Sequence, residues 1–418
     1  MNYTIAAGQR SGTVSVPASK SYAHRQLICA ALGQAHSELI CHGLSKDILA
    51  TVSCLNSLGA GIDISGSGII SVEPTVKHTA GVKHLYCGES GSTLRFLLPI
   101  VGALGEQAMF HMEGRLSKRP LDDLLNALIS HGMQIRRSES NLLCFGSLAS
   151  GEYTIRGNVS SQYISGLLLA LPMLSGDSVL TIAEGVESAD YIAMTEDVMR
   201  RSGIHFEKVG NSYMVYGNQH YSAPDKVIVE RDWSNAAFFL CMGAMSDRGI
   251  TVCDLSSDSM QGDKKILRVL EQFGAEVSIS CGRVSVRKNR LLGQTVDASD
   301  IPDLVPAISA LAAFAEGTTR IINAGRLRYK ESNRLKTTAN MLRAVGADVD
   351  EAEDGLLICG KPYLTGGIVD AANDHRIAMA AAVAACGCVN AITVNGADCV
   401  NKSYPDFWKA LEALEVGK

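Results

Sequence analysis

A short pattern recurs five times along the chain: Leu or Met, three residues, a glycine, and then a stretch of alternating apolar residues. A helix that ends at a glycine and is followed by a strand produces this pattern. Successive copies are 71 to 73 residues apart, because their glycines are Gly59, Gly132, Gly203, Gly274 and Gly346. Five copies at nearly constant spacing indicate duplication of one unit of about seventy residues.

The two ends of the chain fit a sixth unit. "PDFWKALEALE" near the C-terminus is typical of a helix with no strand after it, and "NYTIAAG" at the N-terminus of a strand with no helix before it. We expect the first strand to complete the last unit. A chain of 418 residues is too long for one ordinary core, so six units predict two domains of three units each. The predicted domains are 1–17 plus 231–418, and 18–230.

Each unit also contains a segment that is apolar nearly all round, such as "TLRFLLPIVGAL" and "RIAMAAAVAACG". A helix without a polar face must be buried on all sides. Polar residues gather at the N-terminal ends of these segments, where Ser and Asp are ordinary caps. Arg95 and Arg376 are unusual there, because the helix dipole disfavours positive charge. A bound anion would explain both.

Positively charged residues cluster at helix starts and in loops between the apolar segments. Each alone is ordinarily a solvated surface residue, but together they indicate two anionic ligands or one with several charged groups, since Arg binds phosphate and carboxylate bidentately. The net charge of −5 disfavours binding to nucleic acid or an anionic membrane. The eight residues are Lys20, Arg25, Arg95, Arg119, Lys330, Arg334, Arg376 and Lys402.

In "RYKESNRL", Lys330 and Arg334 are four residues apart with Glu331 between them. On one helix they would share a face and repel each other by a few tenths of a kcal/mol. Either they splay into solvent or an anion lies between them. Glu331, Asp303 and Asp374 are candidates for proton transfer. The structural alternatives are an N-cap role for Asp303 and an ion pair between Glu331 and one of the two cations.

Several function classes are disfavoured. "GESGST" at 88–93 resembles a phosphate cradle but is no P-loop, and no G-x-G-x-x-G opens a βαβ unit, so ATP and NAD are not indicated. The twelve cysteines form no C-x-x-C pair and have no His at zinc spacing, which predicts reduced thiols, no metal and no cofactor. Neither a signal peptide nor an apolar run of membrane length is visible. We expect a cytoplasmic protein.

The motifs resemble those of the 5-enolpyruvylshikimate-3-phosphate (EPSP) synthase family, from about residue 8 to residue 410. They are "VPASKSYAHRQLICAAL", "GESGSTLRFLLP", "RLSKRPLDDLL", "GNVSSQYISGLLLALPML", "IPDLVPAISALAAFAEGTTRI", "RYKESNRL", "NDHRIAM" and "NKSYPDFW". The resemblance implies an α/β fold of two similar domains, each made of three βαβαββ repeats around buried parallel helices, an inside-out α/β barrel. It places the active site in the cleft between the domains.

The resemblance implies transfer of the enolpyruvyl group of phosphoenolpyruvate to the 5-hydroxyl of shikimate 3-phosphate, through a tetrahedral intermediate, by a monomer. Asp303 would take the hydroxyl proton, and Glu331 or Lys20 would protonate the methylene carbon. Shikimate 3-phosphate would be held by Ser21, Arg25, Ser160, Ser161, Gln162, Ser188, Tyr191, Asp303 and Lys330. Phosphoenolpyruvate would be held by Lys20, Gly91, Arg119, Gln162, Arg334, Arg376 and Lys402.

Some positions depart from the family pattern. Glu89 stands where Asn is usual, so either it pairs with a nearby cation or Arg95 is structural and the cradle differs. One alternative is UDP-N-acetylglucosamine enolpyruvyltransferase, which typically has Lys-Asn where this chain has Lys20-Ser21. The other is a non-catalytic anion-binding module, which retention of Lys20, Asp303 and Glu331 disfavours. The remaining departures are Ala18, Phe96, Arg231 and Asn333.

Overall fold

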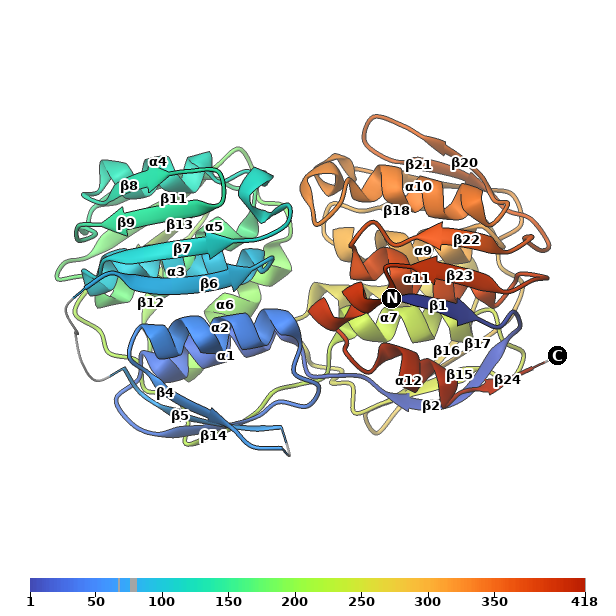
Figure 1. The fold of residues 1–418 in the computed structure, drawn as a ribbon, viewed down its shortest axis with the longest axis horizontal. Helices are drawn as coiled ribbons and strands as arrows, with labels where there is room; N and C mark the ends of the chain where they lie inside the picture. Colours follow the sequence, from blue (N-terminus) through green and yellow to red (C-terminus); the bar gives the residue numbers. More distant parts are fainter. Residues whose placement is uncertain (67, 76–80, 418) are drawn as a thin grey trace. The chain divides into compact units, whose positions relative to one another are not determined.

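The computed structural model describes residues 1–66, 68–75 and 81–417. These residues fall into two compact units: unit 1 comprises Met1–Pro17 and Glu230–Lys418, and unit 2 comprises Ala18–Val229. Figure 1 shows that each unit has its own sheets and helices. The chain re-enters unit 1 at Glu230, one residue before the expected Arg231.

Among the described residues of unit 2 there are three four-stranded sheets, ordered β14-β3-β5-β4, β6-β7-β9-β8 and β10-β11-β13-β12. In each sheet the first two strands are parallel and the other neighbours antiparallel. The strands are β3 (Ser37–Ile40), β4 (Gly61–Ile64), β5 (Ile69–Glu73), β6 (Lys83–Gly88), β7 (Ala108–Met112), β8 (Gln134–Arg137), β9 (Asn141–Phe145), β10 (Glu152–Arg156), β11 (Ser178–Ala183), β12 (Phe206–Val209), β13 (Ser212–Val215) and β14 (Lys226–Ile228). The helices are α1 (Lys20–Ala31), α2 (Lys46–Ser57), α3 (Gly91–Leu104), η1 (Leu116–Lys118), α4 (Asp122–Ser130), α5 (Ser161–Ala170), η2 (Leu171–Met173) and α6 (Ala189–Arg201).

Unit 1 repeats this plan with sheets ordered β16-β17-β15-β2-β24, β18-β19-β21-β20 and β1-β23-β22. The parallel pairs are β2 with β15, β18 with β19 and β22 with β23. The strands are β1 (Asn2–Ile5), β2 (Arg10–Ser15), β15 (Ile250–Cys253), β16 (Glu276–Ser280), β17 (Arg283–Arg287), β18 (Thr295–Asp297), β19 (Thr318–Ile322), β20 (Asp348–Glu351), β21 (Leu356–Cys359), β22 (Gly367–Asp370), β23 (Ile392–Asn395) and β24 (Glu415–Val416). The helices are α7 (Trp233–Gly243), η3 (Gly262–Lys265), α8 (Ile266–Phe273), η4 (Pro302–Leu304), α9 (Val305–Ala312), η5 (Gly325–Tyr329), α10 (Arg334–Ala344), α11 (His375–Ala385), η6 (Ala397–Lys402) and α12 (Phe407–Glu412).

The five repeat glycines follow α2, α4, α6, α8 and α10, and each precedes a strand. All have positive φ, between 77° and 105°, a conformation that glycine adopts at little cost. Gly274 directly follows α8, whereas one further cap residue separates the other helices from their glycine. The predicted repeat of helix, glycine and strand is confirmed.

The first strand completes the last repeat, as predicted. β1 pairs antiparallel with β23, with Asn2 opposite Asn395 and Ile5 opposite Ile392. The expectation that no strand follows the last helix is wrong, because β24 pairs antiparallel with Arg10 and Ser11 of β2. That strand has two residues, too few for a period of two to show in a sequence.

The apolar helices are buried, as predicted. Every residue of α9 and α11 is buried, and α3 and α5 are nearly so. Gly166 allows α3 and α5 to approach closely, because a side chain there would collide with the carbonyl oxygen of Arg95. The six helices α1, α3, α5, α7, α9 and α11 thus contribute most of their residues to the two cores, and the starts of several of them carry candidate site residues.

Candidate functional site

The starts of α3 and α5 in unit 2 are joined through Arg95. Its Nη1 donates to Gln162 Oε1 at 2.8 Å and its Nη2 to the carbonyl oxygen of Pro120 at 3.1 Å. Gln162 Nε2 in turn donates to Ser92 Oγ at 2.9 Å. Arg95 is buried, so its guanidinium bridges α3, α5 and the segment before α4. This geometry favours a structural role for Arg95 and orients the amide of Gln162.

Gly91, the first residue of α3, lies against two guanidinium groups. A Cβ at this position would lie 2.5 Å from Arg95 Nη1 and 2.8 Å from Arg119 Nη1. Any larger residue would therefore displace at least one of these arginines. Because Arg119 approaches the positive end of the α3 dipole, this part of unit 2 is suited to an anion.

Lys20 is the first residue of α1, which is capped by Ser19. Its Nζ forms an ion pair of 2.8 Å with Asp47 Oδ2, and both side chains are about one-sixth exposed, at 16% and 14%. The sequence interpretation missed Asp47, because an acid in the first turn of an amphipathic helix is ordinary. This carboxylate holds the ammonium group of a candidate catalytic residue in place.

Arg25 is buried and connects α1 with α6. Its guanidinium donates to Thr195 Oγ1 at 2.7 Å, to the carbonyl oxygens of Ser21 at 2.7 Å and Tyr191 at 2.8 Å, and to Ser165 Oγ at 3.3 Å. Burial lowers the pKa of Arg25 to about 10, so it stays charged at neutral pH. Four predicted ligand residues are thus brought together, since Tyr191 N also donates to the carbonyl oxygen of Ser188 at 3.1 Å.

Ser160 and Ser161 lie at the start of α5. Ser160 is the N-cap and accepts from the backbone N–H of Gln162 at 3.3 Å. Ser161 begins the helix and is buried. Both hydroxyl groups therefore stand at the positive end of a buried helix, beside Gln162, as the motif implies.

A chain of buried side chains links α1, α2 and α3. His24 Nδ1 lies 2.7 Å from Thr51 Oγ1, Thr51 Oγ1 lies 2.7 Å from Thr93 Oγ1, and the Thr93 hydroxyl donates to Ser90 Oγ at 2.7 Å. Burial, aided by Lys20, lowers the pKa of His24 well below its ordinary value. His24 is therefore the packed, hydrogen-bonding residue that a histidine on a buried helix ordinarily is.

In unit 1, Arg334 at the start of α10 binds three carboxylates. Its Nη1 pairs with Asp303 Oδ1 at 2.9 Å, its Nε with Asp374 Oδ2 at 2.9 Å and its Nη2 with Glu331 Oε2 at 2.6 Å. The guanidinium is 1% exposed. One cation therefore gathers all three predicted acids, and the structural alternative of an ion pair between Glu331 and Arg334 is present.

Asp303 also binds Arg376, whose Nη2 lies 3.0 Å from Asp303 Oδ2 and whose Nη1 donates to the Asp303 carbonyl at 3.0 Å. Burial alone would raise the pKa of Asp303, but Arg376, Lys330 and Arg334 outweigh it and hold that pKa well below its ordinary value. The N-cap alternative for Asp303 is wrong, because it lies in η4 and gives α9 no cap hydrogen bond.

Lys330 and Arg334 do not share a helix face. Lys330 has extended backbone after η5, and α10 begins only at Arg334 with Asn333 as its cap. Both cations instead approach the same oxygen, since Lys330 Nζ lies 3.5 Å from Asp303 Oδ1. Burial lowers the pKa of Lys330 to about 8. A carboxylate thus offsets the repulsion between the two cations.

The start of α11 completes the unit 1 cluster. Asp374 caps the helix by accepting from the backbone N–H of Arg376 at 3.0 Å, and it also accepts from Ser332 Oγ at 2.9 Å. Lys402 at the end of η6 lies beside this segment, because its Nζ donates to the carbonyl oxygen of Asn373 at 2.7 Å. The predicted residues of unit 1 therefore form one continuous network.

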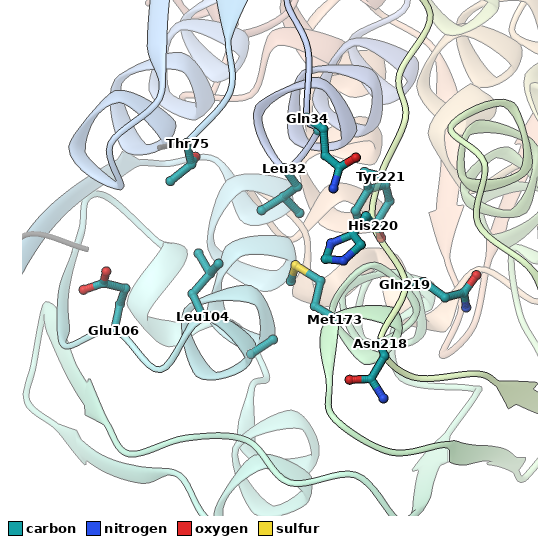
Figure 2. Close-up of a pocket in the computed structure, with 12 residues that line it drawn as sticks. Leu32, Gln34, Thr75, Leu104, Glu106, Met173, Asn218, Gln219, His220 and Tyr221 are labelled. Carbon is teal, nitrogen blue, oxygen red and sulfur yellow. The ribbon is translucent and has the colours of Figure 1, made fainter. Parts of the chain in front are cut away.

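One pocket of unit 2 lies away from all the predicted residues. A pocket of about 420 Å³ in unit 2 lies at the opposite ends of α1 and α3, where Leu32 and Leu104 stand, and none of the predicted residues lines it. Figure 2 shows Leu32, Leu104 and Met173 around it, with His220 nearby. Within the described ranges, no group of three or more His, Cys, Asp or Glu could hold a metal ion. No helix in those ranges has the length and apolarity to span a membrane.

The chain matches known proteins over nearly its whole length. Residues 6–411 match the family model described as EPSP synthase (3-phosphoshikimate 1-carboxyvinyltransferase). A protein of that enzyme name from Clostridium kluyveri is 42% identical over 408 residues, which cover 96% of this chain and 95% of the relative. One from Clostridium acetobutylicum is 42% identical over 409 residues, with the same coverage.

Solved structures agree on the fold. The EPSP synthase of Acinetobacter baumannii superimposes with a TM-score of 0.82 at 26% identity and covers 100% of both chains. The enolpyruvyl transferase NikO of Streptomyces tendae gives a TM-score of 0.80 at 18% identity, covering 100% of this chain and 99% of the other, which shows the fold alone. The chain belongs to the EPSP synthase (3-phosphoshikimate 1-carboxyvinyltransferase) family.

Proposed function

We propose that this chain transfers the enolpyruvyl group of phosphoenolpyruvate to the 5-hydroxyl of shikimate 3-phosphate and releases phosphate, a step of aromatic amino-acid biosynthesis. The observation that carries the proposal is a family match that spans both units, residues 6–411. Relatives at 42% identity bear the name of this activity. The motif residues Lys20, Asp303 and Glu331 are all present.

The ligand roles divide between the units. In unit 2, shikimate 3-phosphate would be held by Ser21, Arg25, Ser160, Ser161, Ser188 and Tyr191. Phosphoenolpyruvate would be held there by Lys20, Gly91 and Arg119, and Gln162 would contact both ligands. From unit 1, Asp303 and Lys330 would complete the first set, and Arg334, Arg376 and Lys402 the second. The proposal therefore requires the two sets to meet in a cleft, with closure driven by the anionic ligands. Small-angle scattering should show a smaller radius of gyration with both ligands; an unchanged radius argues against closure.

The ion pairs of unit 1 support a mechanism in which substrate binding activates the base. Without ligand, Asp303 is a weak base because Arg334, Arg376 and Lys330 surround it. Anionic groups of the substrates would draw these cations away, so the pKa of Asp303 would rise and it could accept the hydroxyl proton.

The addition step then forms the bond between the substrate oxygen and C2 of phosphoenolpyruvate, while Glu331 or Lys20 gives a proton to the methylene carbon. Elimination removes a proton from the resulting methyl group and expels phosphate, which restores the double bond. The surrounding cations stabilise the carboxylate of the tetrahedral intermediate, and charge arranged in advance is commonly the largest catalytic term.

A substrate assay tests the function. We expect phosphate release only when phosphoenolpyruvate and shikimate 3-phosphate are both present. Turnover with UDP-N-acetylglucosamine instead would assign the chain to the sister activity, and binding of the anions without turnover would indicate an anion-binding module. Asp300→Ala is a matched control for Asp303 variants, because Asp300 is an acid nearby in sequence that is 48% exposed.

We further propose a cytoplasmic monomer. Each unit has its own buried core, which supports a chain that folds without a partner. None of the twelve cysteines, all of which the structure describes, forms a disulfide bond, and most are buried, in keeping with a reducing compartment. Light scattering on the purified protein should give the mass of one chain, 44.4 kDa; twice that mass contradicts the monomer.

A further inference from the structure

Asp263 is a buried acid of unit 1 that the proposed mechanism does not use. It lies in η3, is 3% exposed, and accepts through Oδ2 from the hydroxyl of Ser234, the second residue of α7. Its Oδ1 is also buried and has no hydrogen-bond partner among the residues that the structure describes. The hydrogen bonding of this carboxyl group is therefore half complete.

The half-complete hydrogen bonding favours the neutral acid. A buried ionised oxygen without a donor is costly, because the hydration that it loses is not replaced. Asp303 and Asp374 each have an ion pair with an arginine, whereas no Lys or Arg in the described part of the chain forms one with Asp263. Among these three acids, Asp263 is the one whose surroundings oppose ionisation.

Asp263 nevertheless lies close to the acid–base network. Helix α7 packs against η3, which carries Asp263, against η4, which carries Asp303, and against α11, which carries Arg376. Burial and the negative charge of Asp303 raise the pKa of Asp263 to about 7, against the opposing effects of Arg376 and of the Ser234 hydrogen bond; Asp232 adds a smaller repulsion. The carboxyl group of Asp263 therefore gains or loses its proton near neutral pH.

We propose that Asp263 is a positioning residue that adjusts how readily Asp303 accepts a proton. When Asp263 is neutral it does not compete for Arg376, so the ion pair between Arg376 and Asp303 keeps Asp303 a weak base. Ionised Asp263 adds a negative charge beside Asp303 and competes for Arg376, so Asp303 becomes a stronger base. The same added charge weakens the hold of Arg376 on an anion. This inference rests on the proposed role of Asp303, so its first test does not involve turnover.

The first test is a titration of carboxyl carbons by ¹³C NMR without substrates. The resonance absent from the Asp263→Asn variant should titrate near pH 7 in the wild type. In Asp303→Asn that resonance should titrate at lower pH, because coupling between two sites is reciprocal. A resonance that titrates near pH 4 would overturn the proposal whatever the catalytic role of Asp303. An Asp263 resonance unmoved in Asp303→Asn would overturn it equally.

The second test is the pH dependence of turnover. In the wild type we expect kcat to rise about 3- to 10-fold between about pH 6 and 9, since a change of one pKa unit in a base is a tenfold change in its proton affinity and the rate follows all or part of it. The Kd for phosphoenolpyruvate should rise over the same range. Asp263→Asn should lack both changes, while Glu196→Gln, which removes a buried acid of unit 2, should keep them.

Ser234→Ala provides a second variant in case Asp263→Asn does not fold. Loss of the Ser234 hydroxyl removes a hydrogen bond that stabilises the ionised carboxyl, so the kcat step should move to higher pH without disappearing. A structural role alone would lower kcat at every pH and leave the midpoint in place. An unmoved midpoint in Ser234→Ala, or a normal step in folded Asp263→Asn, would overturn the proposal. If Asp303→Asn keeps full turnover while the NMR coupling is present, the base assignment fails and the coupling of Asp263 to Asp303 stands.

Discussion

The buried arginines Arg25 of unit 2 and Arg334 of unit 1 are held in different ways. In unit 2, Arg25 is bound by hydroxyl and backbone carbonyl oxygens, which are neutral, although Lys20 is paired with the carboxylate of Asp47. In unit 1, Arg334 and Arg376 are bound by carboxylates. An anion at Arg25 would therefore compete with neutral groups, whereas at Arg334 or Arg376 it must compete with acids. This contrast agrees with the proposed roles of Arg25 in anion binding and of Asp303 in proton transfer.

The largest effect expected from this comparison is on turnover. Asp303→Ala should lower kcat by about 10²- to 10⁴-fold, the usual contribution of a general base, while the Kd of shikimate 3-phosphate changes much less. Single-turnover kinetics and equilibrium titration separate the two quantities. Equal losses of binding and rate would mean that Asp303 is not the proton acceptor. The control variant Asp300→Ala should behave as wild type.

The second effect is on stability. Arg334→Met leaves buried acids without their cation and should cost about 3–5 kcal/mol in the free energy of unfolding. Arg25→Met leaves only neutral groups unsatisfied and should cost about 1–3 kcal/mol. Urea titration measures both. Both tryptophans, Trp233 and Trp408, lie in unit 1, so their fluorescence follows that unit alone, and circular dichroism follows both.

A larger cost for Arg25→Met than for Arg334→Met would break the comparison. Arg290→Ala serves as control, since its pair with Glu316 is largely exposed, at 72% and 62%, and exposed pairs contribute little.

A smaller effect concerns the anion site of unit 2. Gly91→Ala should displace Arg119 or Arg95, because the added methyl group would overlap both guanidinium groups. Loss of one charged hydrogen bond to phosphoenolpyruvate should lower its affinity by about 1.5–3 kcal/mol. The Kd for shikimate 3-phosphate should change less. Isothermal titration measures both ligands, and an unchanged affinity for phosphoenolpyruvate would contradict the placement of that ligand beside Gly91.

The smallest effect is the response of unit 2 to acid. His24 is neutral when folded and has a pKa well below 6.5, so the unfolded chain binds more protons below about pH 6.5 and stability falls as pH falls. The slope reaches at most about 1.4 kcal/mol per pH unit. His24→Gln should flatten it between about pH 5 and 6.5, as measured by circular dichroism in urea. An unchanged slope would mean that another group carries it.

The local pattern of the sequence predicted much of the fold. Helix, glycine and strand follow one another along the chain, so the repeat at Gly59 to Gly346 needs no distant contact. The sequence also predicted that β1 belongs to the last repeat. The N-terminal segment has a strand without a preceding helix, and the last repeat was expected to have a helix without a following strand.

The pairing of charges could not be predicted in this way. Arg334 binds Asp374, forty residues onward, and Lys20 of α1 binds Asp47 of α2. Neither pair has a sequence spacing that would identify it as an ion pair. The four-residue spacing of Lys330 and Arg334 would matter only on a shared helix, yet Asn333 caps the helix after Lys330. Nothing in the sequence singles out Asp263. Its proposed role depends on a buried carboxyl oxygen without a hydrogen-bond donor, which only the three-dimensional structure reveals.

The pairing of β1 with β23 affects how the protein is made on the ribosome. Residues 2–5 emerge from the ribosome long before their partner at 392–395. All of unit 2, residues 18–229, can fold in the meantime, because domains fold as units during synthesis. The N-terminal strand must wait with exposed backbone groups, the condition in which strands pair wrongly and aggregate.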